Sequence, residues 1–466
     1  MIAEEAFEYD GVEYPAGTVV VSMYQPFRSI VNSQLCDGQF VTVWKGLYSE
    51  AFSQFRIARG YDQITVTEPA AYKEIAAACV EGYDYAGTLE AFADFAAQFS
   101  GVEGADVIIS NASEDAALAV NALLAEGATV GMITEGDYMG DFICSYDDFV
   151  AVVADEYTVA AEGVYGADVV AQVIAKSPVV FINGGYGATT AGNVELPGGN
   201  QYCFDQYALK AMGFELTKQA LKADAIVGNG FGSSNPQDTY AQEAVKTGTP
   251  YMVWGSGSNL RGVLDGVVKA SMSTGTDMTA VVEYPETTLI NANFVLDGVD
   301  LNYQYGTDYF TAMPEGAVAL VKNAGGQPLT GCVLLEDGAD AEYTAALQAE
   351  FEVYNNAVVA FEYQGEGMDV VAFANSLTHK GHPQDEFKYI ANFLFSRSLA
   401  DEAYAGVEAP ADAPEADVPA DKPADKPADK PADAPATGDA TNAMAWIVVA
   451  MAAAVALGAV VYKKEK

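Results

Sequence analysis

An uncharged run of 20 residues, from Ala443 to Tyr462, constrains the fold of this chain most strongly. As a helix it would span about 30 Å, the thickness of the hydrocarbon core of a bilayer. Three lysines follow it, at positions 463, 464 and 466, and such charges hold a chain end on the cytoplasmic side. We therefore predict a transmembrane helix at 443–462, with the bulk of the chain outside the cell.

A pentapeptide ahead of this run resembles the cell-wall sorting signal of Gram-positive surface proteins. It reads Ala434-Pro435-Ala436-Thr437-Gly438. In that family a sortase cleaves Leu-Pro-x-Thr-Gly after the threonine and joins the threonine to the wall. Proline, threonine and glycine match here, and Ala434 stands where leucine is usual. The resemblance implies a sorting signal over 434–466, with sortase and peptidoglycan as partners. The alternative is a plain C-terminal membrane anchor that is never cut.

Residues 406–433 form a linker rich in proline, alanine, aspartate and lysine. The unit Pro-Ala-Asp-Lys occurs three times in succession from Pro419 to Lys430. Regular proline excludes helix and favours an extended polyproline II path. About thirty such residues reach roughly 90 Å, so we interpret this segment as a spacer.

Charge and the N-terminus limit the possible partners and the extent of the chain. The 65 acidic and 22 basic residues give a net charge of −43, which repels nucleic acid. We therefore expect no nucleic-acid partner. The first six residues, Met1–Ala6, carry neither the charged nor the apolar region of an export signal. We expect Met1 to be an internal position of a longer surface protein.

Residues 1–405 alternate short β-branched runs with amphipathic, alanine-rich stretches. This rhythm predicts an α/β fold with a doubly wound, mostly parallel sheet. Strand and turn signals at 280–375 predict additional antiparallel strands, and 385–399 predicts a closing helix with one apolar face. The segment Ser113-Glu114-Asp115 is expected to cap a helix that runs through Leu124, with its carboxylates near the positive end of that helix. The predicted buried strands lie at 106–111, 128–133, 178–183, 225–228 and 250–254.

Glycine clusters follow three of these strands, at 183–187, 228–232 and 255–259. The carboxyl ends of parallel strands line one crevice, where glycine exposes backbone N–H groups and asparagine adds polar side chains. The alternative is turn chemistry alone, since none of the clusters is a complete phosphate-binding motif. The sequence thus predicts that the three loops meet and form a candidate pocket for a small-molecule or peptide ligand. Its residues would be Asn183, Gly184, Gly185, Asn229, Gly230, Ser256 and Asn259.

Catalytic and metal-binding motifs are not recognisable in the sequence. His379 and His382 are the two histidines, and no third ligand accompanies them, so we expect no metal site and no cofactor in this chain. No serine lies in a nucleophile motif. The five cysteines lack metal-ligand spacing, and we interpret most of them as small buried residues. They are Cys36, Cys79, Cys144, Cys203 and Cys332.

Two stretches resemble the region that follows the catalytic domain in large bacterial zinc carboxypeptidases of the carboxypeptidase A type. One is Tyr14-Pro15-Ala16-Gly17-Thr18 with the strand and Gln25-Pro26-Phe27-Arg28 after it. The other runs from Asp369–Phe373 to Asp385–Asn392. The resemblance implies a class I glutamine-amidotransferase-like, flavodoxin-like accessory domain at 69–405, preceded at 1–68 by the remnant of an upstream α/β unit. Zinc would belong to an upstream domain, because the family's ligands match no position here. The cysteine of an amidotransferase is also missing from the glycine turns, which carry Tyr186 and Phe231.

Two functions remain open on these grounds. The chain is either the non-catalytic C-terminal part of a cell-surface zinc metallocarboxypeptidase-like protein or a wall-anchored binding or adhesion protein with an α/β ligand pocket. A solute-binding protein is a third and weaker hypothesis, because the lipid-anchor cysteine of that class is missing.

Overall fold

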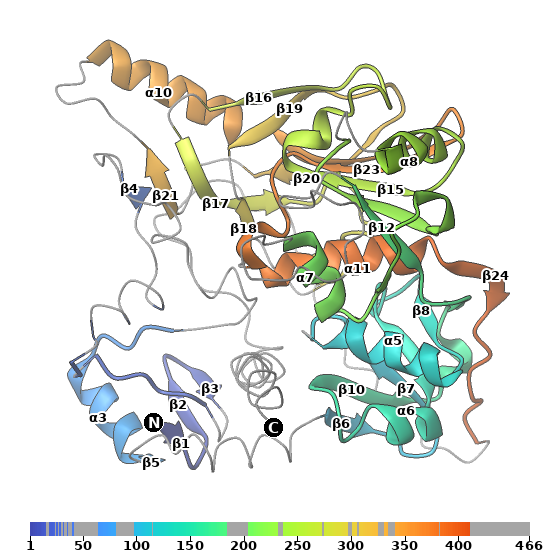
Figure 1. Cartoon of the computed structure of the whole chain (residues 1–466). Helices are drawn as coiled ribbons and strands as arrows, with labels where there is room; N and C mark the ends of the chain where they lie inside the picture. The colour runs from blue at the N-terminus through green and yellow to red at the C-terminus, as the bar shows by residue number, and fades with distance from the viewer. Residues whose placement is uncertain are drawn as a thin grey trace, which may run out of the picture.

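The computed structural model is mixed α/β and contains several multi-stranded sheets (Figure 1). The residues that it describes are 1–14, 18–23, 25–26, 28, 31, 35, 40–41, 64–80, 97–113, 115–183, 204–231, 236–272, 275–296, 301–304, 307–324, 330–333, 341–381 and 383–410.

A seven-stranded sheet is built almost entirely from antiparallel pairs, in the order β24-β11-β8-β9-β7-β10-β6. Only β10 and β6 run parallel. The expectation of a mostly parallel sheet is therefore wrong for this part of the chain. The loop between β8 and β9 is too short for a parallel crossover, which needs a dozen or more residues. The elements are β6 Ala97–Gly101, β7 Asp106–Ile109, α5 Ala116–Glu126, β8 Gly131–Ile133, β9 Phe142–Ser145, α6 Tyr146–Val152, β10 Val159–Val164, β11 Ala171–Ile174 and β24 Leu399–Ala403.

A thirteen-stranded sheet contains the parallel arrangement that the sequence predicts. Its strands β13, β12, β14, β15 and β23 pair side by side and all parallel. Each of the predicted strands at 178–183, 225–228 and 250–254 is present. The elements here are β12 Val179–Asn183, α7 Phe204–Ala211, β13 Glu215–Leu216, η3 Ala220–Lys222, β14 Ala225–Gly228, α8 Pro236–Lys246, β15 Tyr251–Trp254, η4 Gly255–Asn259 and β23 Met368–Phe373.

The rest of this sheet is the antiparallel extension predicted for 280–375. Strand β22 pairs antiparallel with β23 and continues the sheet to β20 and β17. Its elements are β4 Phe40–Val41, β16 Val268–Ser271, β17 Gly275–Glu283, α9 Ala292–Leu296, β18 Leu301–Gln304, β19 Asp308–Ala312, β20 Val318–Asn323, β21 Thr330–Val333, α10 Ala341–Tyr354 and β22 Val358–Gly365.

Both faces of the parallel strands are buried, because helices cover each side. In β12, Val180 and Ile182 join a core that contains α7 and α11, whereas Phe181 joins a core that contains α8. The same alternation recurs in β14, β15 and β23. A strand buried on both faces reads as a continuous apolar run, as the sequence does here. This part of the sheet is therefore doubly wound.

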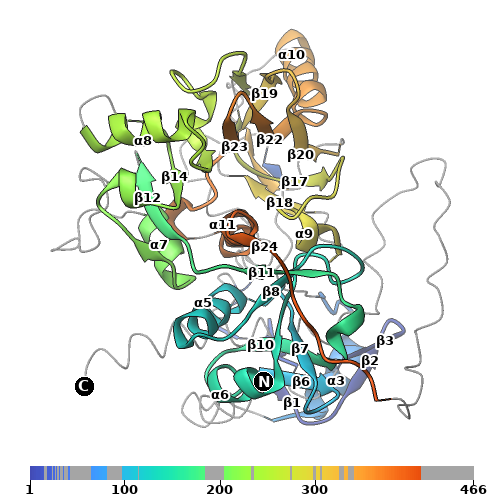
Figure 2. The same ribbon diagram turned by 90° about the vertical axis from the view of Figure 1, so that its right-hand side faces the viewer.

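Helix α11, Phe387–Ser396, lies between the two large sheets (Figures 1 and 2). The ring of its Phe395 packs 5.2 Å from that of Phe142 in the seven-stranded sheet. The closing helix predicted at 385–399 is present, but its predicted single apolar face is wrong. Every residue from Phe387 to Phe395 is buried, because sheets pack against opposite sides of the helix.

The predicted cap of α5 is also wrong in detail. Asp115 occupies the N-cap position without a side-chain hydrogen bond to the helix. Its Oδ2 instead accepts from the Thr158 backbone N at 3.0 Å, and Ser113 Oγ accepts from Ala160 N at 2.9 Å. Both side chains tie the start of α5 to the adjacent β10 segment, which competes successfully for the same acceptors.

The N-terminal elements pack together across the domain boundary expected at residue 68. Strand β1, Ile2–Ala3, pairs with β5, Cys79–Val80, and a small core joins Ala3, Ile75 and Cys79. The unit therefore includes helix α3, Pro69–Ala77. Strands β2 Phe7–Tyr9 and β3 Val12–Tyr14 form a hairpin beside it.

No helix within the described ranges is both long and apolar enough to cross a membrane. The run predicted to do so, 443–462, the pentapeptide 434–438 and most of the linker lie outside those ranges. The described start of the linker is held by the fold, since Val407 N donates to Asp106 Oδ2 at 2.5 Å.

Candidate functional site

The strands preceding the three glycine clusters end side by side at one edge of the thirteen-stranded sheet. Asn183 at the end of β12 is in register with Gly228 at the end of β14, which pairs in turn with Val253 of β15. We call this the carboxyl edge; it comprises the ends of β12, β14, β15 and β23 and the residues that follow them. Gly184 and Gly185 lie outside the described residues.

Direct contacts link the described starts of these loops. Asn229 N donates to Asn183 O at 3.2 Å, and Gly257 N donates to Asn229 Oδ1 at 3.3 Å. Gly230, which has a φ of +100°, lies so close to Gly257 that a Cβ on residue 230 would be 2.6 Å from the Gly257 Cα. The structure therefore brings Asn183, Asn229, Gly230 and Gly257 together, as the sequence predicts for the loops.

The asparagine side chains mainly hold the loops in place. Asn183 is fully buried and its Nδ2 donates to Tyr251 Oη at 3.0 Å. Asn259 Oδ1 accepts from Arg261 N at 3.2 Å, which fixes the turn after η4. Ser256 lies on η4 by its backbone. Among the described contacts, Asn183 Oδ1 is a buried acceptor without a hydrogen-bond partner.

A lysine that the sequence did not single out clamps two strand ends together. Lys269 Nζ donates to Gly255 O at 2.6 Å and to Ala374 O at 3.1 Å, and it forms an ion pair with Asp308 Oδ2 at 2.7 Å. Its side chain is only 12% exposed. An ammonium group has three donors, and these three acceptors match them. Lys269 thus fixes the ends of β15 and β23 at the carboxyl edge.

Asn375 completes this clamp from the segment after β23. Its Oδ1 accepts from Asp308 N and its Nδ2 donates to Asp308 O, both at 3.0 Å. Its backbone O accepts from Gly255 N at 3.3 Å. No local sequence signal marks these residues, because Lys269 and Ala374 are 105 positions apart and Gly255 and Asn375 are still further apart.

A buried carboxyl group lies on the other side of the same edge. Asp205, the second residue of α7, is 3% exposed. Its Oδ1 accepts from Trp254 Nε1 at 3.2 Å and from Thr378 Oγ1 at 2.5 Å. Burial raises the pKa of Asp205 to about 6, while these two hydrogen bonds lower it. Perturbed carboxyl groups of this kind are concentrated at functional sites.

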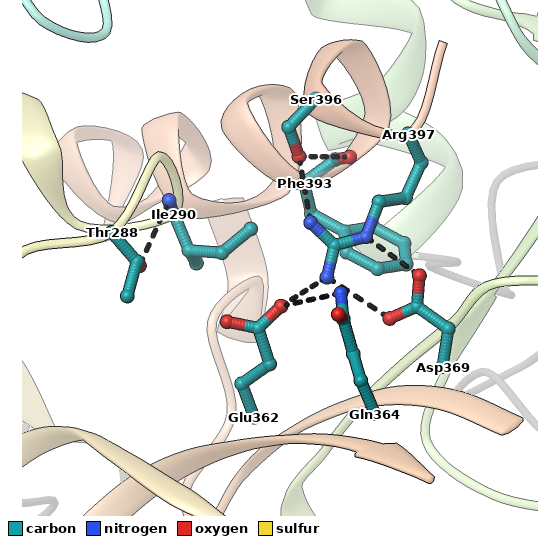
Figure 3. Close-up of polar contacts among 8 residues, drawn as sticks. All are labelled: Thr288, Ile290, Glu362, Gln364, Asp369, Phe393, Ser396 and Arg397. Atoms are coloured by element: carbon teal, nitrogen blue, oxygen red, sulfur yellow. Dashed lines mark hydrogen bonds and ion pairs between the residues drawn. The ribbon is translucent and has the colours of Figure 1, made fainter. Parts of the chain in front are cut away.

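A second polar cluster, at the far end of β23, is structural (Figure 3). Arg397 follows α11 and binds both carboxylate oxygens of Asp369, at 2.8 and 2.9 Å, and also binds Glu362. Asp369 lies near the start of β23 and Glu362 lies on β22. The cluster therefore ties the end of the closing helix to the β22–β23 hairpin, away from the carboxyl edge.

The described residues contain no group of three His, Cys, Asp or Glu side chains placed to hold a metal ion. The His379 ring contacts the Phe204 ring at 5.3 Å between centroids, and His382 lies outside the described residues. Cys79 and Cys144 are free and buried, in agreement with their interpretation as small apolar residues.

Comparisons with known proteins give distant structural similarities. No family model and no curated protein matches the chain. A GMP synthase subunit protein from Thermoplasma acidophilum has 11% identity and a TM-score of 0.27, and the match covers 46% of this chain and 92% of that protein. A ThuA-like protein from Bacteroides uniformis has 8% identity and a TM-score of 0.26, with 43% and 82% covered. SMU.1228c has 15% identity and a TM-score of 0.22, with 47% and 97% covered. At these scores the similarities carry no argument about fold or activity.

Proposed function

We propose that this chain is a cell-surface protein whose α/β part binds a small polar ligand or peptide at the carboxyl edge and carries no catalytic centre of its own. The observation that supports this most is the meeting of the loops after β12, β14 and β15 through Asn183, Asn229, Gly230 and Gly257. In doubly wound sheets such an edge is the usual place of ligand binding.

The turn after β14 supports a binding role over nucleophilic catalysis. A nucleophile on a strand-to-helix turn must project a side chain above the sheet. At Gly230 a Cβ would lie 2.6 Å from the Cα of Gly257, so position 230 of the turn has no room for a side chain. It can instead offer backbone groups to a ligand.

Hydrogen exchange of the full chain tests this proposal. A panel of amino acids, short peptides and monosaccharides is added, and a ligand is expected to slow exchange at 228–231 and 255–260. Gly257→Ala should abolish the protection, because a Cβ at this position clashes with the Gly230 backbone. Leu221→Ala, at a side chain that is 71% exposed on η3, is the control and should keep it. Protection at other segments only, or unchanged protection in Gly257→Ala, would reject the site.

The resemblance to metallocarboxypeptidases supports a second candidate, in which this binding part accompanies an upstream zinc peptidase. Its observation is the order of β23, a loop and α11 over the second matching stretch. In that case this chain has no zinc-dependent peptidase activity of its own. Incubated with peptides, it would show no chelator-sensitive release of a C-terminal amino acid. An upstream reading frame with His-x-x-Glu and a later histidine would favour this candidate.

The surface location is proposed from the C-terminal sequence. Sortase and peptidoglycan would be the partners if the pentapeptide 434–438 is cut, and the membrane alone if it is not. In either case the linker at 406–433 would separate the binding part from the anchor.

A further inference from the structure

The carboxyl group of Asp205 is held rigidly at the carboxyl edge. Trp254 is the last residue of β15, and Thr378 lies in the segment after β23. Both donate to the same carboxylate oxygen, Oδ1. The start of α7 is thereby joined to the ends of two parallel strands.

That second oxygen is left without a hydrogen bond. Across the described residues Asp205 Oδ2 has no hydrogen-bond partner, although the residue is only 3% exposed. A buried acceptor without a donor is unfavourable, and a buried carboxylate without one is more so. Because the pKa is about 6, the group is mainly ionised at neutral pH. Within the described part of the chain, only one of the two oxygens of this buried carboxylate therefore accepts hydrogen bonds.

Aromatic side chains occur on the same two segments of the chain. Phe204 precedes Asp205 on α7, and its ring contacts that of His379. Tyr207, two residues further, is 44% exposed, and its Oη accepts from Gln384 Nε2 at 3.2 Å.

We propose that Asp205 Oδ2 binds a cationic nitrogen of the ligand, an ammonium or guanidinium group, at the carboxyl edge. This inference rests on the proposed binding function and names the ligand class for it. A group that only donates hydrogen bonds fits an oxygen that only accepts them. An anionic ligand group at this point would add a second buried negative charge.

The NMR signal of the Trp254 indole N–H reports directly on this site, because that group donates a hydrogen bond to Asp205. The chain has three tryptophans, so the indole region of an NMR spectrum holds three signals, and Trp254→Phe assigns one of them. The full chain is titrated at pH 7.5 with putrescine, and with 1,4-butanediol as a neutral probe of equal length. We expect putrescine to shift the Trp254 signal with saturation, and the diol to leave it unchanged.

Two variants distinguish binding at Asp205 from nonspecific attraction of amines to a chain with a net charge of −43. Asp205→Asn should weaken the apparent affinity for putrescine about tenfold or more, since a hydrogen bond to a charged group is lost. Asp401→Asn removes an exposed carboxylate of β24 and should leave the affinity unchanged. Equal loss in both variants, equal shifts with the diol, or no saturable shift at Trp254 would overturn the inference.

The Gly230 and Gly257 amide signals distinguish the two proposals. A probe that shifts these amides but not the Trp254 indole would keep the binding function and reject the cationic assignment. If the ligand panel shifts neither the amides nor the indole, the binding function itself fails.

Discussion

At the scale of single residues, the buried carboxylate of Asp205 is unfavourable, and protonation at low pH neutralises it. Its pKa is about 6 in the folded chain, against an ordinary value of 3.8. Between these values the folded state keeps a proton that the unfolded state has released. The stability that Asp205 contributes is therefore present below about pH 4 and is lost as the pH rises to about 6.

We predict that Asp205→Asn removes this dependence. Relative to the wild type, the variant should gain about 3 kcal/mol in unfolding free energy between pH 4 and pH 7.5, at about 1.4 kcal/mol per pH unit between the two pKa values. Urea unfolding of both proteins at the two pH values measures the difference. Asp401→Asn serves as the exposed control. A difference that stays constant with pH would contradict the buried-charge interpretation.

At the scale of elements, the closing helix depends on the ion cluster at its end. Arg397, with a side chain 14% exposed, faces two carboxylates, Glu362 and Asp369 (Figure 3). Removing the cation leaves both of these partly buried carboxylates uncompensated, which costs about 1–3 kcal/mol, between the values for exposed and for buried ion pairs. The helix is held by this cluster as well as by its apolar packing.

We expect Arg397→Met to lower the unfolding free energy by about 1–3 kcal/mol. Arg397→Lys should lower it less, because the charge remains while the two-pronged contact with Asp369 is lost. Denaturant unfolding compares the variants. If Arg397→Met is as stable as the wild type, or less affected than Arg397→Lys, the cluster is not what secures the helix.

At the scale of the whole molecule, a buried amide network joins the two large sheets. Asn111 follows β7 of the seven-stranded sheet, and its Nδ2 donates to Asn392 Oδ1 on α11 at 2.5 Å. It also donates to Asn293 Oδ1 on α9 at 3.0 Å. All three residues are buried, so each lost partner leaves an unpaired polar group.

A double-mutant cycle should therefore detect coupling between the sheets. Asn111→Leu and Asn392→Leu are each expected to cost about 1–3 kcal/mol. Their combined effect should differ from the sum by about 0.5–3 kcal/mol. Asn111→Leu combined with Asn356→Leu, an exposed site on the loop after α10, should be additive. Additivity in the first pair would mean that the network does not couple the two sheets.

The C-terminal segment makes a separate prediction for the molecule in its cell. If sortase cuts after Thr437, then Thr437→Ala should move the protein from the wall fraction to the membrane fraction, because the carbonyl is no longer presented in the recognised motif. Cell fractionation followed by immunoblotting measures this. Extraction of both proteins by detergent alone would identify a permanent membrane anchor.

The sequence by itself determined the strands that are buried on both faces. The apolar runs at β12, β14 and β15 predict strands correctly, because residues buried on both faces leave a continuous pattern. The glycine clusters after them correctly predict where those strands end. Since parallel neighbours end at one edge, the meeting of the loops followed from the same pattern.

Only the tertiary structure decided which strands pair and which polar groups meet. The apolar run of β7 looks the same whether its neighbours are parallel or antiparallel, so the seven-stranded sheet was missed. Asp205, Trp254 and Thr378 are spread over 173 positions, and Lys269 reaches a carbonyl 105 positions away. Periodicity reports only whether a position is buried, whereas pairing and polar contacts depend on distances that the folded chain alone sets.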